Sequence, residues 1–195
     1  MERINELLYK AANWGADCIY GVVDGDKYNT LDRNKMADII KIFLMNMSNI
    51  IIIYGFAMVF GNFLKTLTIH LSYTITKKFS FGSHVKNETV YAMISIGLFV
   101  LLPFVTPYIA IDNNATILVF SVIVYLHWLY APANTQKYPV IEPRKRGVLK
   151  CISMLCVTGL AVLALLMPDE EIKTLYALGA ICQTVNILPI PHRIK

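Results

Sequence analysis

Charged residues are scarce in this chain and unevenly placed. Asp, Glu, Lys and Arg make up 16% of the 195 residues, whereas 56% are hydrophobic. Residues 42–64, 89–111 and 113–136 contain no charged side chain, and 151–167 and 174–191 are two further apolar stretches. Each is close to the roughly 20 residues that a helix needs to cross the hydrocarbon of a bilayer. The shortage of charge argues against a soluble domain and predicts an all-α, polytopic protein of the cell membrane, with one domain over residues 1–195.

Several catalytic and binding motifs are also missing. The four cysteines lack the spacing of metal ligands, and the chain has no Gly-rich phosphate loop, zinc motif or pair of intramembrane carboxylates. These absences argue against an ATPase, a metalloprotease and a carboxylate-driven ion pump, and we expect no metal and no cofactor. The basic residues are dispersed over loops without interleaved aromatic residues, so no nucleic-acid partner is expected.

The distribution of positive charge predicts the number of spans. The apolar region 42–76 is too long for one helix, and Gly61-Asn62 is a turn signal at which it divides. The six predicted spans are about 42–60, 63–78, 91–111, 114–132, 149–167 and 172–190. All Lys and Arg except Lys65 and Lys173 then fall on the face that holds both termini. Because basic loops stay in the cytoplasm, we expect both termini there; five spans would place the basic N-terminal segment outside.

Residues 1–41 are too polar for a span but contain a helical apolar pattern. One face is predicted to carry Ile4, Leu7, Leu8, Ala11, Trp14 and Cys18. This pattern predicts an amphipathic helix lying at the membrane interface, with Trp14 as an anchor. The basic cytoplasmic face would attract anionic membrane lipid or an acidic peptide. His70 and His127, in the second and fourth spans, are predicted to form hydrogen bonds between helices.

His84 is the candidate reactive group, because it lies just before the third span and on the predicted cytoplasmic side. Gly82 allows a turn that other residues resist, so the imidazole could fold back over the start of the span. Glu88, four residues on, could orient the ring as the acid of a catalytic triad does. Tyr91, seven residues on, lies near the same face. The alternatives are a solvated loop histidine and, for Tyr91, an aromatic residue at the membrane interface.

Three segments of the chain carry a resemblance to a known family. They are Gly82-Ser83-His84 with a further key position at residue 91, Tyr130-Ala131-Pro132-Ala133-Asn134-Thr135-Gln136-Lys137, and Ile187-Leu188-Pro189-Ile190. In their order and spacing they resemble the accessory gene regulator B (AgrB) family, over nearly the whole chain. His84 matches the family's histidine, Gly82 its glycine, and Lys77-Lys78 its upstream basic pair. The candidate substrate-binding residues are Lys77, Lys78, Gly82 and Glu88.

The resemblance implies a membrane cysteine endopeptidase of a Gram-positive bacterium that acts in quorum sensing. It implies a short amphipathic propeptide with an acidic C-terminal tail as substrate, and a homodimer. The tail would be removed in the cytoplasm through an acyl-enzyme, and the propeptide's own cysteine would then close a thiolactone. The family's nucleophilic cysteine belongs at position 91, where this chain has Tyr91. A phenol with a pKa near 10 is harder to ionise than a thiol with a pKa near 8.5.

Two functions therefore stay open. The first is an enzyme of the autoinducer system, either with altered chemistry at Tyr91 or as a variant of a competent parent. The second is a catalytically inactive membrane protein that still binds the propeptide on its basic face. A small transporter is a weaker third alternative, because no pathway of intramembrane acids is present.

Overall fold

The computed structural model describes residues 2–22, 30–81, 93–133 and 143–188. These residues form helices and no strands, which confirms the all-α fold for the described part of the chain. The chain divides into two compact units, residues 1–55 and 56–195, and each is described by itself. Helix α2 (Thr30–Val59) begins in the first unit and ends in the second.

The first unit contains α1 (Glu2–Val22) and the N-terminal part of α2. Ala12, Ala16 and Ala37 are buried there, and a Cβ on Gly15 would lie only 3.6 Å from Ile40. Such small side chains let two helices approach closely. The predicted apolar face of α1 is exposed at its described positions, which are Leu7, Ala11, Trp14 and Cys18. An exposed apolar face suits an interfacial helix, although its placement on a membrane stays a prediction.

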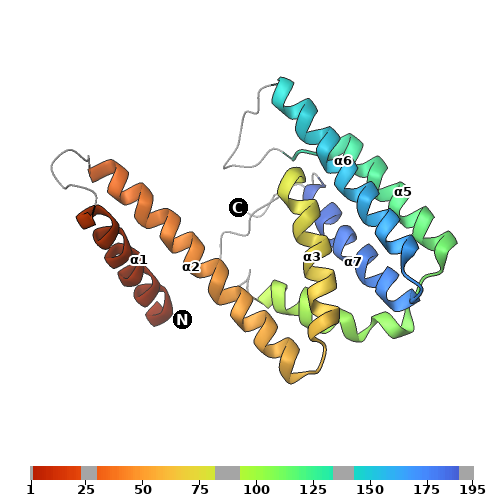
Figure 1. Cartoon of the computed structure of the whole chain (residues 1–195), viewed down its shortest axis with the longest axis horizontal. Coiled ribbons are helices and arrows are strands. Elements are labelled where there is room, and N and C mark those ends of the chain that lie inside the picture. Colours follow the sequence, from red (N-terminus) through yellow and green to blue (C-terminus); the bar gives the residue numbers. More distant parts are fainter. Residues whose placement is uncertain (1, 23–29, 82–92, 134–142, 189–195) are drawn as a thin grey trace, which may run out of the picture. The chain divides into compact units, whose positions relative to one another are not determined.

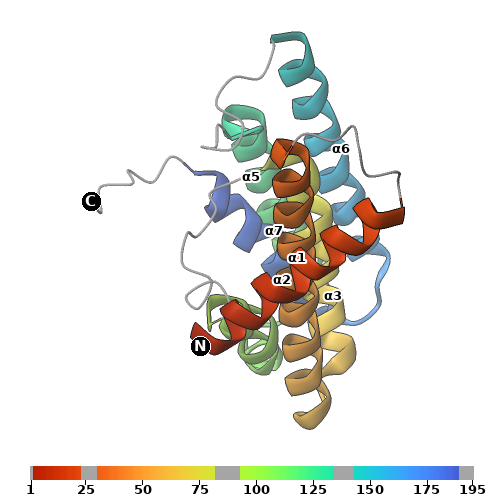
Figure 2. The same cartoon turned by 90° about the vertical axis from the view of Figure 1, so that its left-hand side faces the viewer.

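The second unit is built mainly from four helices, namely α3 (Phe63–Ser80), α5 (Asn113–Tyr130), α6 (Pro143–Leu166) and α7 (Glu170–Ile187). Figure 1 shows them packed side by side, with α3 against α7 and α5 against α6. Figure 2 shows the same grouping from a second direction. The main buried cluster consists of residues from α5, α6 and α7: Phe120, Ile123, Val157, Leu160, Ala164, Ala177 and Ala180.

The predicted division of region 42–76 is found where the turn signal stands. Helix α2 ends at Val59 and α3 begins at Phe63. Gly61 adopts a φ of 68°, which glycine tolerates best, and the Asn62 N–H donates to the Ala57 carbonyl. The pattern is typical of a helix C-terminus closed by a left-handed glycine.

The region predicted as one regular span over 91–111 has a different structure. From residue 97 its described part consists of a π-helix at Gly97–Leu101 and 3₁₀ turns at Leu102–Phe104 and Thr106–Tyr108. Pro103 and Pro107 lack the backbone N–H that a continuous α-helix requires. The apolar helical stretch among the described residues is Met93–Phe104, and the residues directly before it lie outside the described part of the chain. The described part of this region is thus not a continuous α-helix, and a membrane span over 91–111 stays a prediction.

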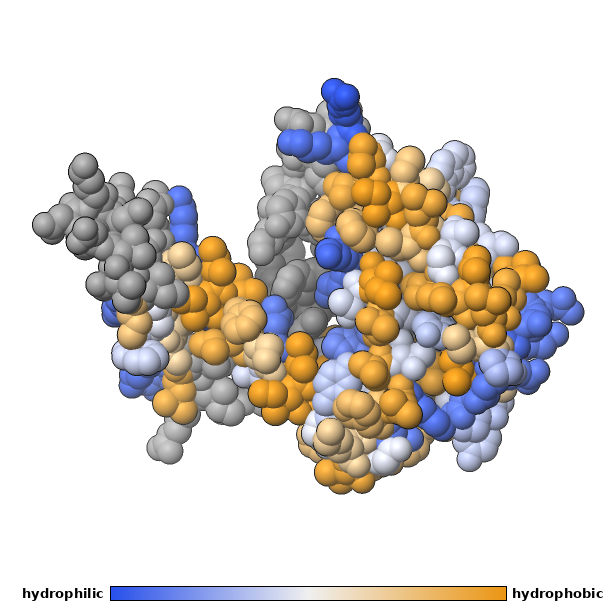
Figure 3. Space-filling view, in the orientation of Figure 1, coloured by the Kyte–Doolittle hydropathy of each residue, from blue (hydrophilic) through white to orange (hydrophobic). Residues whose placement is uncertain are grey.

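By length and composition, three helical segments of the described residues are able to cross a membrane: Asn34–Val59, Asn113–Tyr130 and Arg144–Leu166. Large apolar side chains are exposed on them, among them Leu118 and Leu155. Hydrophobic residues cover much of the surface seen in Figure 3. These features support a membrane protein. The full set of six spans remains a proposal, because α3 and α7 carry several polar residues that are buried in the protein.

Candidate functional site

Four of the predicted site residues lie outside the described part of the chain: Gly82, His84, Glu88 and Tyr91. Whether the imidazole of His84 meets position 91 is therefore not tested. Lys77 and Lys78 are described, and both lie in the last turn of α3, directly before the His84 segment. The structure around this helix end is the described part of the candidate site.

Helix α3 ends in an unusual backbone conformation. The Phe81 N–H donates to the Lys77 carbonyl at 3.1 Å and closes the last turn. Phe81 itself has φ 57° and ψ −138°, a left-handed φ that non-glycine residues rarely adopt. The backbone thus changes direction at Phe81, the last described residue before Gly82, and the turn expected at Gly82 itself stays a prediction.

Helix α7 contacts this junction through Gln183, which is fully buried. Its side-chain Nε2 donates to Ser80 Oγ at 2.8 Å and also to the Phe81 carbonyl. Ser80 Oγ in turn donates to the Thr76 carbonyl at 2.7 Å. The sequence analysis did not single out Gln183. The available signal was an amide side chain in the apolar run 174–191, where a polar group needs a partner.

The Tyr130–Ala133 segment also reaches the end of α3. The Ala133 N–H donates to the Ser80 carbonyl at 2.9 Å, and Ala131 and Pro132 are buried. The Ala131-Pro132 peptide bond is cis. The backbone hydrogen bond thereby joins the second of the three segments that carry the family resemblance to Ser80, two residues before Gly82. Gln183 lies one turn before the third segment at Ile187.

Basic side chains surround this end of the second unit. Lys77 Nζ donates to the Tyr73 hydroxyl at 3.1 Å, and the same hydroxyl lies 3.4 Å from Asn186 Nδ2. Lys78 is exposed. The first turns of α6 begin at this end as well (Figure 1) and add three exposed basic residues, Arg144, Lys145 and Arg146. The combined positive charge can attract an acidic peptide segment.

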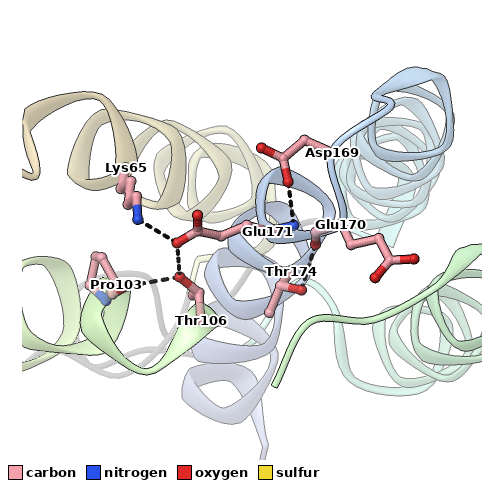
Figure 4. A network of polar contacts seen from close by, with 7 residues as sticks. All are labelled: Lys65, Pro103, Thr106, Asp169, Glu170, Glu171 and Thr174. Atoms are coloured by element: carbon pink, nitrogen blue, oxygen red, sulfur yellow. Dashed lines mark hydrogen bonds and ion pairs between the residues drawn. The ribbon is translucent and has the colours of Figure 1, made fainter. Parts of the chain in front are cut away.

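A second polar cluster lies at the opposite end of α3 and α7, and Figure 4 shows it. Lys65 Nζ forms an ion pair with the Glu171 carboxylate at 2.5 Å, and Thr106 Oγ1 donates to that carboxylate at 2.7 Å. Glu171 precedes the proposed span 172–190. The hydrogen bonds from Lys65 and then Thr106 lower the pKa of its carboxyl group, although partial burial acts in the opposite direction. This cluster attaches the 3₁₀ turn at Thr106–Tyr108 to the helices.

The buried histidine of α5 forms the interhelical contacts that the sequence predicted. His127 Nδ1 lies 2.7 Å from Ser153 Oγ on α6, and Nε2 lies 3.3 Å from Thr184 Oγ1 on α7. All three residues are buried, so a peptide has no access to this histidine and serine pair. The His70 ring contacts Phe99, with 4.7 Å between ring centroids. Among the described residues, no group of three or more His, Cys, Asp or Glu side chains could hold a metal ion.

Comparison with known proteins gives a consistent set of relatives. The family model described as accessory gene regulator B matches residues 19–187. A putative AgrB-like protein of Listeria monocytogenes serotype 4a is 35% identical over 155 residues, covering 80% of this chain and 76% of the relative. Accessory gene regulator protein B of Staphylococcus saprophyticus is 32% identical over 165 residues, covering 83% and 86%. No solved structure matches the chain.

Proposed function

Since this chain belongs to the accessory gene regulator B family, and so to the accessory gene regulator system of quorum sensing, we propose that it acts on the system's autoinducer propeptide at a cytoplasmic membrane site. The substrate is a short amphipathic peptide with an acidic C-terminal tail. The chain spans the membrane six times with both termini inside, α1 lies at the interface, and two copies form a dimer.

The observation that best supports this proposal is that the end of α3, Ala133 and Gln183 meet at one basic end of the second unit. The end of α3, which leads to His84, is bonded to Ala133 and to Gln183, and Lys78 and Arg146 are exposed at the same end. A peptide whose acidic tail binds this end would bring its cleavage site near the His84 segment. The attraction is about 1 kcal/mol for each basic residue near a membrane surface.

The proposed reaction requires a nucleophile at position 91. A thiolate there attacks the carbonyl carbon of the scissile peptide bond, and the tail leaves as an amine after taking a proton from the imidazolium of His84. The propeptide's own cysteine thiol then attacks the acyl group, which releases the enzyme thiol and forms the thiolactone. Tyr91 offers a phenol whose ordinary pKa, about 10, makes this first attack slow near pH 7.

A second function, binding without cleavage, is favoured by Tyr91 itself. The basic end remains intact in this chain, so the propeptide can still bind where the nucleophile is missing. Both functions predict a complex with the propeptide, and they differ in whether the tail is released.

Co-expression with a cysteine-containing, acidic-tailed propeptide distinguishes the two functions. We expect the chain with Tyr91 to retain the propeptide uncut, and Tyr91→Cys to release the tail, as measured by mass spectrometry. Adding His84→Ala to Tyr91→Cys should reduce release at least a hundredfold, in line with the loss of a general base.

Tail release by the unaltered chain that disappears with His84→Ala would establish altered chemistry at Tyr91. If Tyr91→Cys also leaves the tail in place while the protein accumulates in the membrane, the proposed processing function is wrong. If the propeptide could still be crosslinked to the unaltered chain, that result would support binding without cleavage.

A further inference from the structure

The junction at which α3 ends is held more firmly than a helix end requires. The Phe81 N–H already closes the last turn by donating to the Lys77 carbonyl. Gln183 adds hydrogen bonds to Ser80 and Phe81, and Ala133 adds one to the Ser80 carbonyl. Three separate parts of the chain thus fix two consecutive residues.

The backbone of Phe81 gives a reason for these contacts. A φ of 57° with a ψ of −138° is unfavourable for a residue with a side chain. Such conformations persist only where the surrounding structure imposes them, and they concentrate at functional sites. The carbonyl of Phe81, which depends directly on this conformation, accepts a hydrogen bond from Gln183.

The orientation of the Gln183 amide follows from its partners. The Phe81 carbonyl can only accept a hydrogen bond, so the amide nitrogen must face it. The amide oxygen, Oε1, is fully buried and has no hydrogen-bond partner among the described residues. Buried polar atoms without partners are rare, and each calls for a specific explanation. Here the amide nitrogen bonds to the Phe81 carbonyl, and its oxygen is left without a partner within the described part of the chain.

The junction limits where His84 can lie. His84 follows Phe81 by three residues, and three residues of chain span at most about 11 Å. The direction in which the backbone leaves Phe81 therefore restricts the histidine that the proposed reaction uses.

We propose that Gln183 is a positioning residue for His84, acting through Ser80 and Phe81 to set the direction in which the chain leaves α3. This inference rests on the proposed function, because it assigns Gln183 to the same reaction. Gln183 contacts neither the peptide nor position 91 in this role. Its loss should weaken the pairing of His84 with a nucleophile while the membrane fold persists.

The test uses the full chain carrying Tyr91→Cys and needs no propeptide. Iodoacetamide alkylation of the introduced thiol is followed against pH by mass spectrometry, because an imidazole partner lowers the pH at which a thiolate forms. We expect Gln183→Met to raise the midpoint of this profile by about one pH unit. At pH values well below the midpoint, the fraction of thiolate would then be about tenfold smaller. The thermal midpoint of unfolding in detergent is measured on the same samples.

Thr184→Val is the matched control, because Thr184 is the adjacent, equally buried residue of α7 and bonds to His127 instead of the junction. It should lower the unfolding temperature without moving the alkylation midpoint. Ser80→Ala is the second test variant, since it removes one of the two acceptors of Gln183 and should raise the midpoint by a smaller amount. If Gln183→Met does not accumulate in the membrane, Ser80→Ala tests the role of Gln183 in its place.

The outcomes separate this inference from the proposed function. If His84→Ala raises the alkylation midpoint but Gln183→Met and Ser80→Ala leave it unchanged, the role of Gln183 is wrong and the proposed reaction stands. If His84→Ala itself has no effect on the midpoint, the pairing required by the proposed function fails. If Thr184→Val raises the midpoint as much as Gln183→Met, Gln183 has only a general packing role.

Discussion

Gly179 lies where α7 packs most closely against α3. A Cβ at this position would lie 2.6 Å from the Ile69 carbonyl oxygen and 2.7 Å from Ser72 Cβ. Tyr176 lies one turn before Gly179 on α7, and its carbonyl accepts a hydrogen bond from Ser72 Oγ on α3 at 2.8 Å. This bond joins the two helices directly. A side chain at residue 179 would therefore push the helices apart and break this hydrogen bond.

Gly179→Ala should destabilise the protein by about 1–3 kcal/mol, the usual range for overpacking a close contact. The measurement is unfolding in detergent, followed by circular dichroism at increasing temperature. Gly159→Ala is the control, because a Cβ on Gly159 of α6 meets no heavy atom within 4 Å. Alanine is the better helix former, so this control should be neutral or slightly stabilising. Equal losses for both variants would contradict the close α3–α7 contact.

At the residue scale, the sequence predicted some contacts and missed others. His127 was expected to bond between helices, and it lies against Ser153 and Thr184. Lys77 and Lys78, which the family resemblance assigned to substrate binding, lie in the last turn of α3, and their role stays a prediction. Gln183 and Ser80 were missed because a hydropathy pattern shows that they are polar but does not show which residues they form hydrogen bonds with. Their partners lie about a hundred residues away along the chain, so only the packing of α3 on α7 identifies them.

Two helix interruptions show what the hydropathy pattern predicts and what it does not. The break at Gly61-Asn62 was predictable, since glycine marks a left-handed turn and residues 42–76 exceed one span. The interruption after Gly97 was not predicted, because Pro103 and Pro107 carry no charge and leave the uncharged run 89–111 unbroken. Their effect is on backbone hydrogen bonding, which a count of charged residues does not register.

The cluster around Glu171 attaches this interrupted element to α3 and α7. The ion pair with Lys65 and the hydrogen bond from Thr106 favour the ionised carboxylate and lower its pKa in the folded state. Because the pKa of Glu171 is lower in the folded state, its ionisation stabilises the fold at pH values above the pKa of the unfolded state, which is about 4.3 for Glu. This contribution is lost as the pH falls from that value through the lowered one.

Glu171→Gln should accordingly be less stable than the unaltered protein at pH 7, and the difference should shrink as the pH falls below about 4.3. Unfolding temperatures in detergent between pH 7 and pH 3.5 measure this effect. Glu170→Gln is the control, because Glu170 is exposed and lies in the same first turn of α7, so both experience the helix dipole similarly. A gap between Glu171→Gln and the unaltered protein that stays constant to pH 3.5 would contradict the role assigned to the ion pair.

Across the second unit, the two ends differ in charge. One end carries Lys77, Lys78 and the basic first turns of α6, and the other carries Asp112, Asp169 and Glu170 with Lys65 paired to Glu171. An apolar surface separates these ends on α5 and α6. This arrangement is typical of a membrane protein whose basic end faces the cytoplasm.

Cysteine labelling tests this orientation in a background whose four native cysteines are changed to serine. Asn114→Cys, at the acidic end, should react with a membrane-impermeant maleimide added to intact cells. Arg146→Cys, at the basic end, should react only after the cells are permeabilised. Both positions are exposed at the start of a helix, so accessibility to solvent is matched. The reverse pattern would overturn the proposed orientation and the cytoplasmic placement of the reaction.

The interrupted segment after Gly97 has a consequence for how this part of the protein can meet lipid. Pro107 offers no N–H to the Pro103 carbonyl, which instead accepts a hydrogen bond from Thr106 Oγ1 at 2.7 Å. Hydrocarbon supplies no hydrogen-bond donor, so irregular backbone at membrane depth has to be covered by protein. Pro103 and Thr106 are buried, as such cover requires.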